Sequence, residues 1–342
     1  MDTMSTAVAE AATPDAEAPQ PPPTLQEQAR QDALRAEVKR LQAVRRCAMA
    51  DIAKEVGIPN GTFSQWVAGT YAGRNERIGE AVRKWLGSVE AAAQSRAVLP
   101  DAPGFLMTPG AEMFFAAFEH AQHAPDIAVV SGGAGVGKTS SIVAYRAKAS
   151  NVWVLTGEPC ITTPRMLLDE LADLLGVSEG RSAHRTSRAI ADRLRGTRGL
   201  LVVDEAQHLG TTTLDQVRTL HDLAGVGVAL VGNEAVASRI EGSRRRAEFA
   251  QLFSRVGIRV SRARPAAGDV KALLDAWGVH GAAERRLAGA IARNPGGLRV
   301  MTKVLRMAAM QANAAQEAGI PARMIEMAWE QIAARPLVEV AA

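Results

Sequence analysis

The 342-residue sequence has few of the residues that build disulfide-stapled domains, metal clusters or membrane spans. Its two cysteines, Cys47 and Cys160, lie far apart without a CxxC pair, which excludes a disulfide framework and a cysteine metal site and fits a reducing compartment. No apolar run approaches the roughly 20 residues of a membrane span. The first residues are rich in alanine, glutamate and proline, so we expect no secretory signal, a cytoplasmic location and no membrane partner.

Aromatic residues are also scarce, at 4% of the chain, whereas hydrophobic residues reach 47% and charged residues 22%. This is the composition of an ordinary folded protein, and its many alanines favour helices. The net charge is only +4, from 40 Lys and Arg against 36 Asp and Glu. Such an excess permits nucleic-acid binding but does not establish it, because the distribution of charge matters more than its total.

Changes in composition divide the chain into five segments. Residues 1–28 contain a proline run and lack apolar periodicity, so we expect a disordered tail. Residues 29–88 have a compact helical pattern, and residues 89–104, rich in Ala, Ser, Gln and Pro, are expected to be a linker. Residues 105–263 alternate between strand and helix patterns, and residues 264–342 are expected to form an all-helical lid or C-terminal domain.

Short apolar runs separate the helical patterns of residues 105–263. Runs of this kind are typical of a buried parallel sheet. The expected strands lie at residues 127–130, 152–155, 200–203, 228–231 and 258–260. We therefore predict an α/β fold with a parallel-sheet core and a helical lid, preceded by an all-α domain.

A complete phosphate-binding motif follows the first expected strand. Residues 132–139 satisfy the pattern G-x-x-x-x-G-K-[ST], and a helix is expected from about Lys138. Backbone N–H groups of such a loop surround phosphates, and the helix dipole adds positive potential. We expect Lys138 to contact the β- and γ-phosphates of ATP and Thr139 to ligate Mg²⁺. The predicted nucleotide-binding residues of this loop are Gly132, Gly133, Ala134, Gly135, Val136, Gly137, Lys138, Thr139 and Ser140.

Polar residues end the third and fourth expected strands. Asp204 fits the metal-side aspartate of a nucleotide site, and Glu205 fits the residue that polarises the attacking water. Asn233 is placed to hold the same water or to touch the γ-phosphate. Ligands bind at this edge of open α/β sheets. The plainer alternatives are an acidic strand end for the first pair and a turn-forming residue for Asn233.

This order of phosphate loop, acidic strand end and asparagine-ended strand resembles the AAA+ ATPases over residues 105–262. The resemblance implies ATP hydrolysis, with Asn233 as the sensor-1 residue. It also implies an arginine finger that acts across a subunit boundary, and Arg255, just before the fifth strand, is the preferred candidate. Arginines at 244–246 compete for this role, although such a run is more often solvated or DNA-facing.

The helical region contains Gly-Gly-Leu-Arg at residues 296–299, which is similar to the sensor-2 element of the same family. The similarity implies that Arg299 faces the γ-phosphate. The alternative is a basic residue on an exposed lid helix.

Residues 48–67 have the pattern of two helices joined by a tight turn. A small Ala53 lets the helices cross closely and Gly57 permits a left-handed turn, a spacing that resembles the helix-turn-helix of phage-repressor-type domains. The predicted DNA-binding residues are Asn60, Ser64 and Gln65 on the second helix, with Arg74 and Arg77 near phosphates. The alternative is an ordinary αα-hairpin that docks protein.

The whole arrangement, with the run at residues 62–73, resembles the phage Mu target-DNA activator B family over about residues 33–335. The resemblance implies ATP-dependent self-association into helical filaments on double-stranded DNA, delivery of that DNA to a DDE transposase and stimulation of strand transfer. Two alternatives are an ATP-driven transcriptional regulator and a secretion or assembly ATPase. The sequence lacks the receiver domain or membrane segment that these alternatives would normally need, so the transposition function is preferred.

Overall fold

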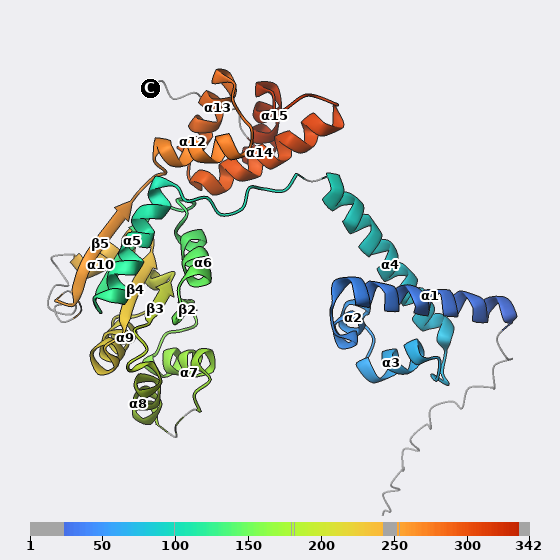
Figure 1. The fold of residues 1–342 in the computed structure, drawn as a ribbon, viewed down its shortest axis with the longest axis horizontal. Coiled ribbons are helices and arrows are strands. Elements are labelled where there is room, and N and C mark those ends of the chain that lie inside the picture. Colours follow the sequence, from blue (N-terminus) through green and yellow to red (C-terminus); the bar gives the residue numbers. More distant parts are fainter. Residues whose placement is uncertain are drawn as a thin grey trace, which may run out of the picture. The chain divides into compact units, whose positions relative to one another are not determined.

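The structure, a computed structural model, describes residues 24–98, 100–178, 180, 182–241, 252 and 254–334. The chain divides into two units, Met1–Ala97 and Val98–Ala342 (Figure 1), and each has its own hydrophobic core. Residues 1–23 of the expected tail and the arginine run at 244–246 lie outside the described residues.

The amino-terminal unit consists, within the described residues, of α1 (Leu25–Arg45), α2 (Met49–Val56), α3 (Asn60–Ala68) and α4 (Asn75–Val98). A capping box begins α1: the Thr24 N–H donates to the Glu27 carboxylate and the Glu27 N–H donates to the Thr24 hydroxyl. Residues 25–28 are therefore helical, and the prediction that the tail extends to residue 28 is wrong at its end. The reason is the capping pair, which starts a helix without apolar periodicity.

The turn between α2 and α3 has left-handed geometry. Gly57 has φ 79°, and the Ala53 carbonyl accepts hydrogen bonds from the N–H groups of both Gly57 and Ile58. Trp66 of α3 is fully buried; its indole N–H donates to Gln31 of α1 over 3.1 Å. This burial fixes α3 against α1 and leaves its polar residues on the outer face.

Helix α4 extends further than the sequence pattern indicates. It continues to Val98, so the segment 89–98 of the expected linker is helical. Ala91, Ala92 and Ala93 are exposed and contribute nothing to the core of this unit. Alanine and glutamine are strong helix formers, and this intrinsic propensity extends α4 beyond its packed part.

The second unit contains a sheet of β1 (Ile127–Gly132), β2 (Val152–Thr156), β3 (Leu200–Asp204), β4 (Gly227–Gly232) and β5 (Val256–Arg262). The strand order is β2-β3-β4-β1-β5, and all neighbours are parallel. Strands β1, β3 and β4 are buried along their whole length. The expected strands and the expected α/β fold class are thus confirmed.

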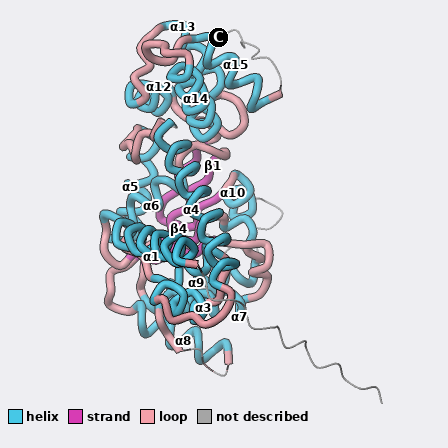
Figure 2. The backbone as a smooth tube through the Cα atoms, turned by 90° about the vertical axis from the view of Figure 1, so that its right-hand side faces the viewer, coloured by secondary structure: helices cyan, strands magenta, loops and turns pink. Residues whose placement is uncertain are grey.

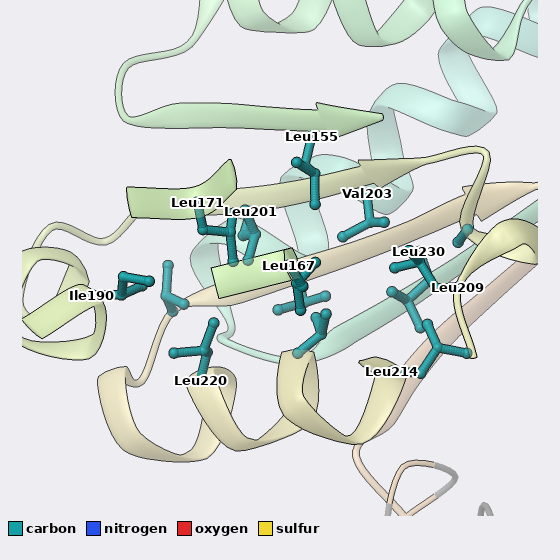
Figure 3. Close-up of a cluster of buried hydrophobic side chains, with 14 of the residues drawn as sticks. Leu155, Leu167, Leu171, Ile190, Leu201, Val203, Leu209, Leu214, Leu220 and Leu230 are labelled. Carbon is teal, nitrogen blue, oxygen red and sulfur yellow. The ribbon is translucent and has the colours of Figure 1, made fainter. Parts of the chain in front are cut away.

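Helices cover both faces of this sheet because alternate strand residues are apolar on both sides. One face packs against α7 (Pro164–Leu175), α8 (Ala183–Leu194) and α9 (Thr211–Ala224). Apolar side chains of these helices, among them Ile190 of α8, form one cluster with Leu201, Val203 and Leu230 of the strands (Figure 3). The other face packs against α5 (Pro109–His123) and α6 (Lys138–Lys148).

Beyond β5 the described chain is helical, as expected. Helices α12 (Ala267–Ala276), α13 (Ala282–Ala292), α14 (Gly297–Ala314) and α15 (Ala322–Ala333) form one group (Figure 1, Figure 2). Their buried side chains make a separate hydrophobic core. The fully buried Asp269 of α12 accepts a hydrogen bond from the Gly110 N–H of α5 over 2.7 Å, which ties this lid to the sheet region. None of the described helices is both long and apolar enough to cross a membrane.

Candidate nucleotide site

The phosphate loop connects the buried strand β1 to α6. Gly137 precedes the helix with φ 102°, and Lys138 is the first helical residue. The Lys138 ammonium donates to the carbonyl oxygens of Gly132 over 2.7 Å and Gly133 over 3.0 Å. The Lys138 ammonium, which is predicted to contact phosphates, therefore lies against the phosphate loop. The backbone N–H groups of that loop would bind the same phosphates.

Four charged side chains interact at this loop, from α6, the end of β3 and α14. Burial lowers the pKa of Lys138; the carboxylates of Glu205 and Asp204 act in the opposite direction, and the Arg299 guanidinium adds to the lowering. The fold thus brings together two cations and two anions that the sequence analysis assigned to the nucleotide site.

Thr139 and Asp204, the predicted magnesium ligands, are adjacent. The Thr139 hydroxyl donates to Asp204 Oδ2 and the Glu205 N–H donates to Asp204 Oδ1, each over 2.9 Å. Asp204 is buried, and this burial raises the pKa of its carboxyl, an effect that the two hydrogen bonds and Lys138 oppose. A hydroxyl beside a carboxylate suits Mg²⁺, which takes few protein oxygens and keeps several waters.

Glu205 has an unusual backbone for a residue other than glycine, with φ 52° and ψ 35°. It precedes the short helix η1 (Ala206–His208) and lines the cavity beside the phosphate loop. Its carboxylate accepts a hydrogen bond from the Gln207 side chain. Gln207 is not among the residues predicted from the sequence, because its only signal there is a position two residues after Glu205.

Asn233 lies at the end of β4, as expected, but its amide oxygen has a structural partner. That oxygen accepts the N–H of Ala235 over 2.9 Å and so caps α10 (Glu234–Glu241). The Asn233 amide oxygen thus has the turn-forming role given above as the alternative. The sensor role of Asn233 stays a prediction.

The lid meets the phosphate loop through backbone atoms. The Leu298 N–H of α14 donates to the Gly135 carbonyl over 3.0 Å. A Cβ on Gly135, which has φ 77°, would lie 1.8 Å from the Gly296 carbonyl oxygen, so only glycine fits. This approach brings the first turn of α14, and Arg299 with it, to the nucleotide loop.

A cavity of about 420 Å³ lies against the loop. Loop residues and Glu205 form part of its wall, and lid residues Leu273, Leu298 and Arg299 form another. The rest comes from the segment before α5, including Pro103 and Phe105. We expected residues 103 and 104 in a linker; their place in the wall depends on lid helices distant in sequence. Apolar lining beside a phosphate loop suits a nucleotide base.

Arg255 lies at the amino ends of the strands, opposite to the ends that carry the phosphate loop. Its carbonyl accepts the N–H of Ile127, the first residue of β1, whereas the phosphate loop follows the last. At about 3.3 Å per residue, roughly 17 Å separates those two points. The exposed Arg255 guanidinium donates to Asp222 of α9 over 3.0 Å. Arg255 is thus outside its own nucleotide site, as a finger acting on a neighbour requires.

The predicted DNA-binding residues lie in the amino-terminal unit. Asn60, Ser64 and Gln65 are exposed on α3. Arg74 and Arg77 are exposed as well and line a groove of about 700 Å³ that also includes residues of the α2–α3 turn. The arginines therefore lie close to the beginning of α3, the end of a recognition helix that contacts base edges.

Two protein families match parts of the chain. Residues 254–332 match the C-terminal domain of the Mu B transposition protein, and residues 121–240 match an AAA domain. The AAA match agrees with the sheet and the phosphate loop.

Relatives match most of the chain. It is 39% identical over 263 residues to the ATP-dependent target DNA activator B of Escherichia phage Mu, covering 77% of this chain and 83% of that protein. It is 34% identical over 257 residues to the Mu-like prophage FluMu DNA transposition protein B of Haemophilus influenzae, covering 74% and 88%. The solved ORC2 protein of Aeropyrum pernix, in its ADPNP-ADP complexes, has a TM-score of 0.50 at 17% identity, covering 68% of this chain and 69% of that one, a likeness of fold alone.

Asp204→Asn is expected to stabilise the nucleotide-free protein and to abolish Mg²⁺-dependent ATP hydrolysis. Since burial raises the pKa of Asp204, its ionised form costs free energy in the folded state, a cost that grows as pH rises through the ordinary pKa toward the folded one. The neutral amide removes the cost, and near neutral pH the thermal midpoint should rise above that of the original protein.

The matched control is Asp215→Asn, which changes an exposed aspartate of α9. Its midpoint should stay near that of the original protein. A lower midpoint for Asp204→Asn than for this control would contradict the burial argument.

Proposed function

The chain belongs to the family of the phage Mu ATP-dependent target DNA activator B proteins, and we propose that it assembles on target DNA with ATP and activates a DDE transposase. It is an AAA+ ATPase. The observation that carries the proposal is the identity over 263 residues, an alignment longer than the ATPase core alone. The second relative is named for DNA transposition, which favours this function over a transcriptional or secretion ATPase.

In the proposed nucleotide site Lys138 neutralises the β- and γ-phosphates, and Thr139 with Asp204 holds Mg²⁺, which would neutralise phosphate charge when bound. Glu205 lines the cavity beside the loop and polarises the attacking water. Arg299 approaches from the lid because α14 begins at the phosphate loop. The apolar wall that includes Phe105 and Leu298 receives the base.

Self-association completes this site. The arginine finger must come from a second copy, because Arg255 lies at the sheet edge remote from its own phosphate loop. The partners under this proposal are double-stranded DNA, further copies of the chain and a DDE transposase, all in the cytoplasm. Many subunits side by side on DNA make weak contacts sum to a stable complex.

The function is tested first with two nucleotide-site variants. Lys138→Ala should lose ATP binding and ATP-dependent DNA retention. Glu205→Gln should bind ATP, hydrolyse it roughly 10²–10⁴-fold more slowly and remain on DNA longer, because an amide does not accept the proton of water. Filter binding and phosphate release measure both. Equal DNA retention by the original protein with and without ATP would contradict the proposal, as would failure to stimulate strand transfer by the transposase of the same element.

The DNA module is tested with Arg74→Ala/Arg77→Ala. Each lost phosphate contact should lower the slope of log K against log salt by roughly 0.9, so the double variant should lose nearly two units. ATPase activity without DNA should be unchanged. Arg40→Ala is the control, since Arg40 already pairs with Glu37. If the double variant and the control have the same slope, these arginines dock protein instead.

Arg255 is tested by mixing inactive subunits. Arg255→Ala and Glu205→Gln should each hydrolyse ATP slowly when alone. Mixing them should restore part of the activity, because a site with intact Glu205 then meets the Arg255 of a neighbour. Steady-state phosphate release over a range of ratios measures this. No recovery at any ratio, with assembly retained, would exclude Arg255 as the finger.

A further inference from the structure

The Gln207 side chain connects the ends of two neighbouring strands. Its Nε2 donates to the carboxylate of Glu205, just beyond β3, and its Oε1 accepts the N–H of Asn233, just beyond β4, over 3.2 Å. An amide nitrogen only donates and an amide oxygen only accepts, so the reversed orientation would set like groups against each other at both ends. The orientation of Gln207 is therefore determined by its partners.

The backbone around Gln207 is shaped for this bridge. A Cβ on Gly232, the last residue of β4, would lie 2.3 Å from Gln207 Oε1. Glycine at this position leaves the room that the amide oxygen occupies. Gln207 itself lies in η1, between the fully buried Ala206 and Leu209, and the Leu209 N–H donates to the Ala206 carbonyl over 3.2 Å. The side chain thus extends from an anchored turn.

The backbone of Glu205 also depends on its neighbours. It is in the left-handed region, a conformation that costs free energy and persists where neighbours enforce it. Glu205 lines the nucleotide cavity, whereas Gln207 is not part of its wall. Gln207 therefore contacts the Glu205 carboxylate from outside the residues that line the cavity.

We propose that Gln207 is a positioning residue for ATP hydrolysis, which orients the Glu205 carboxylate toward the phosphate loop and joins it to the Asn233 turn. The inference rests on the proposed role of Glu205. The turn begins α10 through the Asn233 cap, so the bridge makes the catalytic carboxylate and the start of α10 one hydrogen-bonded unit.

The test is Gln207→Leu, which keeps the volume and removes both hydrogen bonds. The kcat for ATP should fall by roughly 10–100-fold, because a displacement of about 1 Å at a reacting group costs up to 10²-fold. The Kd for ATP and the thermal midpoint should stay near those of the original protein. The control is Gln216→Leu, which removes a hydrogen bond to Ser187 between α8 and α9 and should leave kcat unchanged. If Gln207→Leu does not fold, the isosteric Gln207→Glu, which cannot donate to Glu205, replaces it with the same expectation.

A double variant separates positioning from a merely structural role. Gln207→Leu added to Glu205→Gln should cause no further loss of kcat, because a residue that acts only through Glu205 has nothing left to position. An active Gln207→Leu beside an inactive Glu205→Gln would overturn this inference alone, and so would losses that multiply in the double variant. An active Glu205→Gln would overturn the proposed role of Glu205 and this inference with it.

Discussion

The parallel pairing of β3, β4 and β1 is the constraint on which the nucleotide site depends. Because the strands run in the same direction, their carboxyl ends meet at one edge, and β3 and β1 are both neighbours of β4. Two strand spacings, about 10 Å, then separate the acidic end of β3 from the phosphate loop. The strands are buried on both faces, so helices on either side hold this edge in place. Every polar group of the site projects from that rigid edge or closes over it.

Charge balance at this edge explains why the site tolerates its own burial. Desolvation destabilises the ionised forms of Lys138 and Asp204. The opposite charge of each residue partly stabilises the ionised form of the other. Arg299 and Glu205 add one charge of each sign. Such a site is less stable than an apolar one of the same size, a common property of functional sites. The left-handed backbone of Glu205 adds to this cost.

Local patterns predicted most of the fold. Apolar runs located the strands, and the glycine spacing located the phosphate loop and the α2–α3 turn, because each depends on residues close in sequence. Other features of the fold depend on interactions that leave no apolar pattern in the sequence. The start of α1 depends on the cap at Thr24, and the extension of α4 on intrinsic helix propensity, neither of which produces apolar periodicity. The orientation of Gln207 depends on partners at the ends of two strands, and the cavity wall at Pro103 depends on lid helices far along the chain.

The extension of α4 leaves only a short segment before the cavity wall. The helix ends at Val98, and Pro103 already belongs to the nucleotide cavity, so only residues 99–102 lie between them. Even fully stretched, these five Cα steps span about 18 Å. Residues 99–102 therefore limit how far the carboxyl end of α4 can lie from Pro103 of the cavity wall, whatever the orientation of the amino-terminal helices.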